Sequence, residues 1–275
     1  MILIVSALQL EAEPFIARNR MKRVLTRKSL QLFKGGSAML AVCGSGPVGV
    51  AVAVSEIMSF AGVNPDRDLI ANIGMAGGRP PLAPGDIAVC NKIACSFTGR
   101  TLYPEMLISH PFKEGALESF GKPVHGGVCG LDLADMEGAF FWEAASFYLP
   151  ASRIHCIKVV SDAFEPESVS RKLGASLMKN AAATIYDWLE AAAEALLPDD
   201  VKSALDERQM RALDEVCVSL HLTFAMKSRL EALCKKANAR SMDFLPILRE
   251  EALIRAEGKK EGKLRYEKLI QRFVQ

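Results

Sequence analysis

The sequence lacks the residue pairs that usually build metal sites and disulfide frameworks. Its seven cysteines include no Cys-x-x-Cys pair, and its four histidines stand apart from one another. Zinc sites take most of their Cys and His ligands from closely spaced pairs, so we expect no metal site. An odd number of scattered cysteines in apolar surroundings is typical of reduced thiols in an intracellular protein.

Long apolar runs and a strong net charge are also missing. No stretch approaches the roughly 18 consecutive apolar residues of a membrane-spanning helix, so we expect no membrane partner. The apolar run at residues 1–5 has no basic residues before it, unlike a secretory signal peptide. The formal net charge of +2 excludes strong polyanion binding through total charge alone. We therefore expect a soluble, cytoplasmic protein.

Glycine almost disappears after residue 198. Residues 1–198 contain 18 of the 20 glycines, and residues 199–275 contain only two. The second segment has 29 charged residues in 77 positions, against 37 in the 198 positions before it. This change of composition predicts a globular domain over 1–198 and a helical extension over 199–275.

The first segment alternates β-rich runs with helical ones, which indicates an α/β domain. Several of its strands are apolar throughout, as in a sheet that is covered on both faces. The expected strands are 1–7, 30–34, 38–43, 68–73, 86–91 and 154–160. The expected helices are 10–19, 47–61, 137–148 and 168–196.

The second segment is predicted to form three helices, at 206–222, 225–239 and 243–273, because apolar residues recur there at three- and four-residue steps. From Lys227 onward, 13 Lys and Arg residues stand against 7 Asp and Glu residues. We interpret this excess as the solvated basic face of a helical appendage. Nucleic-acid binding is the alternative, and we disfavour it because aromatic residues are not interleaved with the basic ones.

Three acidic residues lie next to runs that have the composition of buried structure. Glu11 follows the first apolar run, Glu137 lies within the segment 131–138, and Asp162 follows the strand predicted at 154–160. Buried carboxylates are costly unless a ligand or a hydrogen-bond partner uses them. The set therefore predicts hydroxyl recognition and proton transfer on a polar small molecule. Structural roles stay open for each: a first-turn helix acid, a helix start and an N-cap, respectively.

Two glycine-rich segments follow predicted strands. Residues 44–49 (Gly-Ser-Gly-Pro-Val-Gly) open a helix, and residues 72–78 (Asn-Ile-Gly-Met-Ala-Gly-Gly) follow an apolar run. Small residues in both segments let backbone amides approach a ligand closely. The first segment is not a dinucleotide-binding motif, because the GxGxxG spacing fails. A tight turn and a loop packed beneath a helix are the alternatives.

The order of these motifs resembles the purine nucleoside phosphorylase/nucleosidase superfamily. The matching elements, in order, are an apolar strand followed by Glu11, Gly-Ser-Gly at 44–46, the segment 72–78, Pro-Gly-Asp-Ile at 84–87, Asp-Met-Glu-Gly at 135–138 and Val-Ser-Asp at 160–162. The sequence is most similar to the methylthioadenosine/S-adenosylhomocysteine nucleosidase and futalosine hydrolase branch, over residues 1 to about 190. The resemblance implies a three-layer α/β fold with a central mixed sheet, here followed by the C-terminal helical extension.

The resemblance also implies a role for each matching residue. Glu11 would activate water, and Asp162 would protonate the leaving base. Glu137 would bind the ribose hydroxyls beside Met136, and Ser161 would orient Asp162. Small or apolar residues would line the rest of the substrate site: Ser45, Gly74, Met75, Ala76 and Gly77. Aromatic candidates for stacking on the base, each with core packing as its alternative, are Phe97, Tyr103, Phe112 and Phe120.

The predicted reaction is hydrolysis of the N-glycosidic bond of a purine nucleoside or a 5′-modified adenosine, with release of the free base and without a cofactor. Met75 stands where relatives often have Ser or Thr near the nucleophile. Asn72 stands near a phosphate-binding Arg of some phosphorylases, so water is favoured over phosphate. One alternative is a phosphate-dependent phosphorylase with Ser45 or Arg79 at the phosphate; another is a catalytically degenerate nucleoside-binding or scaffold protein. The resemblance further implies a homo-oligomer.

Overall fold

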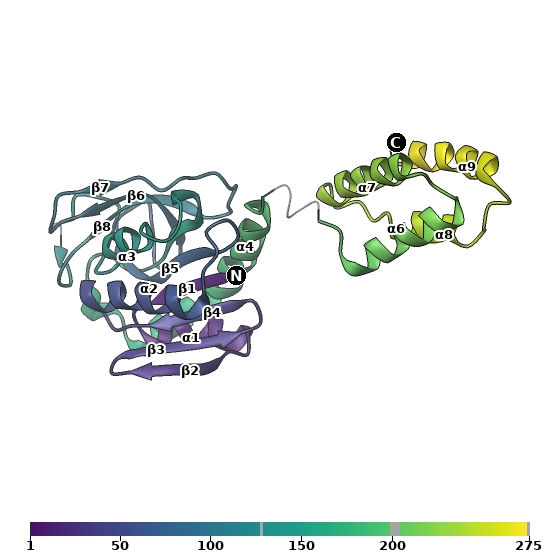
Figure 1. Ribbon diagram of the computed structural model, residues 1–275. Helices are drawn as coiled ribbons and strands as arrows, with labels where there is room; N and C mark the ends of the chain where they lie inside the picture. The colour runs from purple at the N-terminus through teal and green to yellow at the C-terminus, as the bar shows by residue number, and fades with distance from the viewer. Residues whose placement is uncertain (127–128, 199–203, 274–275) are drawn as a thin grey trace. The chain divides into compact units, whose positions relative to one another are not determined.

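The computed structural model describes residues 1–126, 129–198 and 204–273. The chain divides into two compact units, Met1–Leu196 and Leu197–Gln275 (Figure 1). Apolar core clusters of the first unit and of the second share no residue, so each unit is described by itself. The boundary predicted at Pro198 lies two residues after the end of the first unit.

The first unit is built on a mixed sheet, as predicted. Its strands are β1 (Ile2–Ser6), β2 (Lys22–Arg27), β3 (Leu30–Gly35), β4 (Ala38–Val42), β5 (Leu69–Gly78), β6 (Ile87–Cys95), β7 (Thr101–Leu102), β8 (Lys113–Ser119), β9 (Leu133–Asp135) and β10 (Ile154–Asp162). Their order is β10-β6-β8-β9-β5-β1-β4-β3-β2, with β7 beside β6. β1 runs parallel to β4 and β5, whereas the β2–β3 and β3–β4 pairs are antiparallel. Because β10 pairs with β5 as well as β6, the strands β5, β9, β8, β6 and β10 close into a ring.

Helices cover both faces of this sheet. They are α1 (Gln9–Arg18), α2 (Pro47–Ala61), α3 (Gly138–Ala145) and α4 (Arg171–Ala195). α2 and α3 share a core cluster with Leu3 and Val5 of β1, and α1 and α4 share another with Ile2 and Ile4. Alternate residues of β1 thus face opposite cores, and the whole strand is buried. This confirms the predicted three-layer arrangement.

Strands β2, β8 and β9 and the short β7 were not predicted from the sequence. β2 lies at the edge of the sheet and exposes nearly all of its side chains, so no apolar alternation marks it. β9 has only three residues and is defined by its pairing with β5 and β8. β5 and β6 continue to Gly78 and Cys95, past the predicted ends, and the helix predicted over 137–148 ends at Ala145.

The second unit is helical, with α6 (Glu207–Ser219), α7 (Phe224–Ala239), α8 (Leu245–Ala252) and α9 (Lys259–Arg272). The prediction of one helix over 243–273 is wrong, since α8 and α9 are separate. The backbone N–H of Ala256 donates to the Ser219 carbonyl at 2.9 Å, which draws the intervening chain onto the end of α6. α9 then packs closely there, because a Cβ at Gly262 would overlap the Leu220 carbonyl. Within the described residues, no helix has the length and apolar character needed to cross a membrane.

Candidate active site

A cavity of about 210 Å³ lies where β5, β9 and β10 meet the start of α1 and the loop before α2. Its wall brings together predicted site residues from five separate segments: Glu11, Ser45, Met75, Ala76, Gly77, Met136, Glu137, Ser161 and Asp162. Gly74 is the predicted site residue that does not line the cavity. β1, β5 and β10 are parallel, so their carboxyl ends share one edge of the sheet, where ligand sites of α/β folds form.

Glu11 lies in the first turn of α1 and faces the cavity. Its Oε2 accepts a hydrogen bond from the Leu8 N–H at 2.8 Å, and its Oε1 accepts one from the Met75 N–H at 2.8 Å. The residue is 4% exposed, and burial raises the pKa of the carboxyl despite these hydrogen bonds. A Cβ at Gly74 would lie 2.9 Å from Oε1, so the glycine leaves room for the carboxylate. Glu11 is thus a first-turn acid and also a cavity carboxylate with a pKa closer to that of a general base.

Glu137 immediately precedes α3 and contacts the glycine-rich loop before α2. Its Oε1 accepts a hydrogen bond from the Gly46 N–H at 2.7 Å. Gly46 has a φ of 103°, a conformation that favours glycine. Burial and the neighbouring Asp135 carboxylate raise the pKa of Glu137 to about 7. Ser45, from the same loop, is exposed and lines the cavity beside it.

Asp162 ends β10, where the pairing with β5 shifts its register. Its Oδ2 accepts a hydrogen bond from the Ser161 hydroxyl at 2.5 Å, and its Oδ1 accepts one from the Glu165 N–H at 2.7 Å. The carboxylate therefore caps the turn that follows the strand, which is the structural role left open from the sequence. It also lines the cavity, so the structural and functional interpretations of Asp162 are compatible.

Apolar side chains form much of the remaining wall. Met75 and Leu8 lie on the α1 side, and Val124 and Phe164 belong to the same wall. Phe164 adopts a left-handed backbone conformation with a φ of 64°. Its ring lies close enough to β5 that a Cβ at Gly77 would approach it to 2.9 Å. The cavity wall thus combines apolar side chains with its carboxylates.

The aromatic residues proposed from the sequence as stacking candidates do not line this cavity. Phe97 and Tyr103 are 76% and 68% exposed. Phe112 packs against a tryptophan of α4, and Phe120 packs against a small cluster that includes Phe164. Phe164 lines the cavity in their place. The available signal in the sequence was its position two residues after the Val-Ser-Asp motif.

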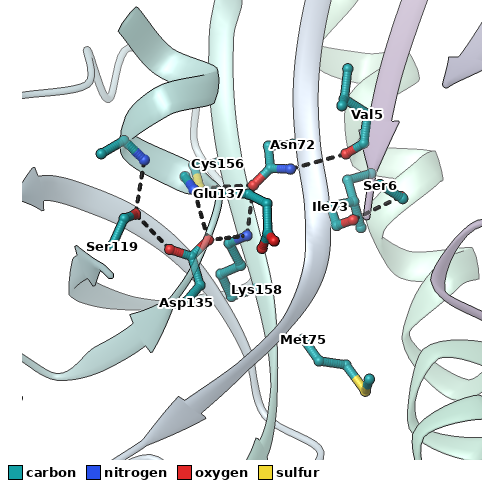
Figure 2. A network of polar contacts seen from close by, with 12 residues as sticks. Val5, Ser6, Asn72, Ile73, Met75, Ser119, Asp135, Glu137, Cys156 and Lys158 are labelled. Atoms are coloured by element: carbon teal, nitrogen blue, oxygen red, sulfur yellow. Dashed lines mark hydrogen bonds and ion pairs between the residues drawn. The ribbon is translucent and has the colours of Figure 1, made fainter. Parts of the chain in front are cut away.

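A buried polar network under the cavity was also missed. Figure 2 shows Lys158 of β10 between Asp135 of β9 and Asn72 of β5. The Lys158 Nζ lies 2.7 Å from the Asp135 Oδ2 and donates to the Asn72 Oδ1 at 2.6 Å. Burial is the largest single influence and lowers the pKa of Lys158, but Asp135, Cys156 and Glu137 together outweigh it, so the pKa is raised. A lysine inside an otherwise apolar strand was the signal in the sequence.

The candidate phosphate ligand Arg79 is engaged elsewhere. Its guanidinium donates to the carbonyl oxygens of Cys129 and Leu131, and the residue does not line the cavity. The described residues contain no group of three His, Cys, Asp or Glu side chains that is arranged to hold a metal ion.

No protein-family model matches this sequence, and no curated protein does. Solved structures match the fold. A 5′-methylthioadenosine/S-adenosylhomocysteine nucleosidase from S. pneumoniae superimposes with a TM-score of 0.58 at 18% identity, over 69% of this chain and 98% of that one. The corresponding enzyme from Neisseria meningitidis gives 0.55 and 18%, over 68% and 98%. Futalosine hydrolase of Helicobacter pylori gives 0.56 and 16%, over 70% and 97%. The chain therefore has the fold of these methylthioadenosine/S-adenosylhomocysteine nucleosidases and of futalosine hydrolase.

Proposed function

We propose that the first unit hydrolyses the N-glycosidic bond of a purine nucleoside or a 5′-modified adenosine. One observation carries the proposal: Glu11, Glu137 and Asp162 converge from three distant segments on one cavity. The fold is shared with enzymes named for this class of reaction, which supports the same class here. A 5′-modified substrate fits the apolar wall that contains Met75 and Leu8.

In the proposed mechanism, Glu11 is the general base. It accepts a proton from a water molecule as the water oxygen bonds to C1′ of the sugar. The bond from C1′ to the base nitrogen breaks, and its electron pair moves to the base. Asp162 donates a proton to the departing base, so that a neutral purine and a free sugar are released. The buried carboxyl of Glu11, with its raised pKa, is suited to the first step.

Glu137 is proposed to bind the ribose hydroxyls. An ionised carboxylate accepts two hydroxyl hydrogen bonds well, and it stabilises positive charge that develops on the sugar as the glycosidic bond breaks. Met136 and Ser45 lie beside Glu137 in the cavity wall, and Ala76 and Gly77 contribute the β5 side. Gly74 supports the site indirectly, through the space that it leaves for Glu11.

Water is preferred over phosphate in this proposal. The Arg79 guanidinium is engaged with backbone carbonyls, and the apolar Met75 occupies the wall next to Glu11. A dianionic phosphate would need compensating cations there. The buried Lys158 has an acidic partner already, so the described wall favours a neutral nucleophile. No cofactor takes part in the proposed reaction.

We also propose that the protein forms a homo-oligomer through the outer surface of α2 and α3. Val48 and Val52 of α2 are 76% and 49% exposed, and Phe147 after α3 is 87% exposed. α2 and α3 pack together, and the hydroxyls of Ser55 and Tyr148 join them at 3.2 Å. Exposed apolar residues gathered on adjacent elements are typical of contact surfaces. All seven cysteines are free, and six of them are buried, which is compatible with the proposed cytoplasmic location.

The test is the release of free base from a panel of nucleosides, in reactions with and without phosphate. Chromatography detects the products. The panel contains adenosine, inosine, methylthioadenosine and other 5′-modified adenosines. Base and free sugar released without phosphate would support the hydrolase. Release that requires phosphate and yields sugar 1-phosphate would make the protein a phosphorylase. A ligand-induced rise in Tm with no release from any nucleoside would favour a binding or scaffold protein.

A further inference from the structure

The Lys158–Asp135 pair is the most deeply buried ion pair in the described part of the chain. Each side chain is 1% exposed, whereas the ion pairs elsewhere in that part include a more exposed partner. Asn72 fixes the lysine from the other side, since its Oδ1 accepts from the Nζ and its Nδ2 donates to the Val5 carbonyl at 3.0 Å. The ammonium is therefore held between Asp135 and Asn72 (Figure 2).

Stability is a weak explanation for this pair. Desolvating two charges costs about as much as their attraction returns, and apolar replacements of similar volume are often neutral or stabilising. The strands around Lys158 are otherwise strongly apolar, so an apolar side chain at this position would suit the core. The position of the pair relative to the cavity supplies a better explanation.

Asp135 connects Lys158 to the start of α3, and so to Glu137. The Asp135 Oδ2 also accepts a hydrogen bond from the Gly138 N–H at 2.8 Å. Its Oδ1 accepts one from the Ser119 hydroxyl at 2.5 Å, and the same hydroxyl oxygen accepts one from the Ala139 N–H at 2.9 Å. The first two amides of α3 are therefore held by Asp135 and its partner, directly after Glu137 in the chain.

Three buried carboxylates gather around this one ammonium. Asp135 is in direct contact with it, and Glu137 and Glu11 lie on the cavity side. After burial, the negative charge of Asp135 is the largest influence that raises the pKa of Glu137, and Lys158 opposes it. Lys158 also opposes the upward shift of the pKa of Glu11.

The other titratable groups near the ammonium are thiols. They belong to Cys43 after β4, Cys90 of β6 and Cys156 of β10. Burial raises the pKa of Cys43 to about 12, and it raises the pKa of Cys90 well above the ordinary thiol value. These two thiols are neutral at physiological pH.

We propose that Lys158 is a positioning residue: with Asp135 it holds the start of α3, and its positive charge favours the ionised forms of Glu137 and Glu11 against the repulsion of Asp135. The proposal rests on the proposed nucleosidase function, because ionised Glu137 binds ribose and ionised Glu11 accepts the proton of water. Lys158 itself contacts neither substrate nor water in this scheme. Its effect is electrostatic and passes through residues that line the cavity.

The direct test is a pH titration of the Glu137 carboxyl, monitored by carbon NMR of full-length protein that is labelled at the glutamate carboxyls. The Glu137 signal is assigned by its loss in Glu137→Gln. In Lys158→Met we expect the titration midpoint to rise by about one pH unit or more, because the cation that opposes the upward shift of the Glu137 pKa is gone. In Asp135→Asn the midpoint falls, because the repelling carboxylate is gone and the ammonium remains. Lys158→Arg keeps the charge and stays near the wild type, and Lys34→Met at an exposed site changes nothing.

Opposite shifts in the two variants separate this proposal from a structural role. If the midpoint is the same in Lys158→Met, Asp135→Asn and the wild type, the proposal is overturned. If Lys158→Met does not fold, Asp135→Asn decides alone, because a general loss of packing does not lower the midpoint of one carboxyl. The pH at which kcat/KM falls on the acidic side of its profile is then expected to shift among the variants in the same order as the NMR midpoints. A uniform loss of activity without such a shift would again contradict the proposal. A wild-type protein without turnover would refute the proposed function, and the NMR titration would still decide the role of Lys158.

Discussion

The two units of this chain differ most in what they bury. Of thirteen buried polar or charged residues among those described, twelve lie in the first unit and one, Ser219, lies in the second. The core of the second unit is made of apolar side chains such as Leu213, Leu230 and Leu248, each fully buried. The first unit combines equally apolar clusters with carboxylates, a lysine and a histidine inside the fold.

This contrast bears on which unit carries the proposed reaction. A buried polar group costs free energy unless it is hydrogen-bonded, and a buried charge costs more. In the first unit the charged members of this set include Glu11, Asp135, Glu137, Lys158 and Asp162, which lie in or directly beneath one cavity. The described part of the second unit has no comparable group, so its interior is explained by folding alone. We therefore assign the proposed reaction to the first unit.

The largest expected effect comes from removing the charge of Glu11. Glu11→Gln keeps the shape of the side chain and an oxygen that accepts from the Met75 N–H, but it cannot take a proton from water. We expect turnover of the substrate found in the nucleoside panel to fall about 10³-fold, within the range attributed to a general base. Binding of a non-hydrolysable nucleoside analogue, measured by calorimetry, is expected to change little. The matched control is Glu13→Gln, an exposed position on the same helix.

A small effect of Glu11→Gln on turnover would contradict the proposed role of Glu11 as general base. If Glu11→Gln retains turnover within about tenfold of the wild type, then Glu11 is only the first-turn acid of α1. If binding falls together with turnover, the residue positions the substrate or holds β5, and another group must activate water.

The second prediction tests whether the core of the helical unit affects only its own stability. Leu230→Ala removes a fully buried side chain from the core of α6–α9 and is expected to lower the free energy of unfolding of that unit by about 3 kcal/mol. Turnover in the first unit should stay within about twofold, because all the residues that line the proposed site belong to the first unit. Urea unfolding, monitored by circular dichroism, measures the free energy of unfolding. The base-release assay measures turnover.

Leu253→Ala is the control for this experiment. Leu253 is 84% exposed, so its truncation should leave stability nearly unchanged. A parallel loss of turnover in Leu230→Ala would show that the helical unit contributes to catalysis, for example by closing the site or by joining subunits.

Elements with a local signature were predictable from the sequence. β1 and β10 are apolar over most of their length, and α2 begins at a proline after a glycine-rich loop. Glu11, Glu137 and Asp162 were noticed because each stands beside such an element. The convergence of Glu11 and Asp162 follows from the parallel pairing of β1, β5 and β10, which the order of the motifs implied through the resemblance. Glu137 follows β9, which pairs with β5 in the antiparallel direction.

Features that depend on distant partners were not predictable. β9 is a strand only because β5 and β8 pair with it, and the break between α8 and α9 depends on a hydrogen bond from Ala256 to α6. Lys158 was visible as a lysine in an apolar strand, but its partner Asp135 lies on another strand. The place of Phe164 in the cavity wall was not predicted, because it depends on a left-handed backbone conformation.

The smallest expected effect concerns the cost of keeping Glu137 charged inside the fold. The pKa of Glu137 is raised from 4.5 to about 7 in the folded protein. Between these values the folded state holds a proton that the unfolded state has released. The stability from this group is therefore complete below the unfolded pKa and is lost as pH rises through about 7. Over a range from about pH 5 to about pH 8, the loss amounts to about 2 kcal/mol.

Glu137→Gln removes this pH-dependent loss of stability, because the amide does not ionise. Its oxygen still accepts the hydrogen bond from the Gly46 N–H. We expect the variant to be more stable than the wild type at about pH 8 and similar to it at about pH 5, by urea unfolding. The difference between the two curves reports the removal of the Glu137 charge, and Glu13→Gln should follow the wild type. Curves that stay parallel across this range would show that Glu137 titrates normally. A variant that gains stability at alkaline pH and loses ribose binding would show that the first unit carries a buried charge at a site where function requires it.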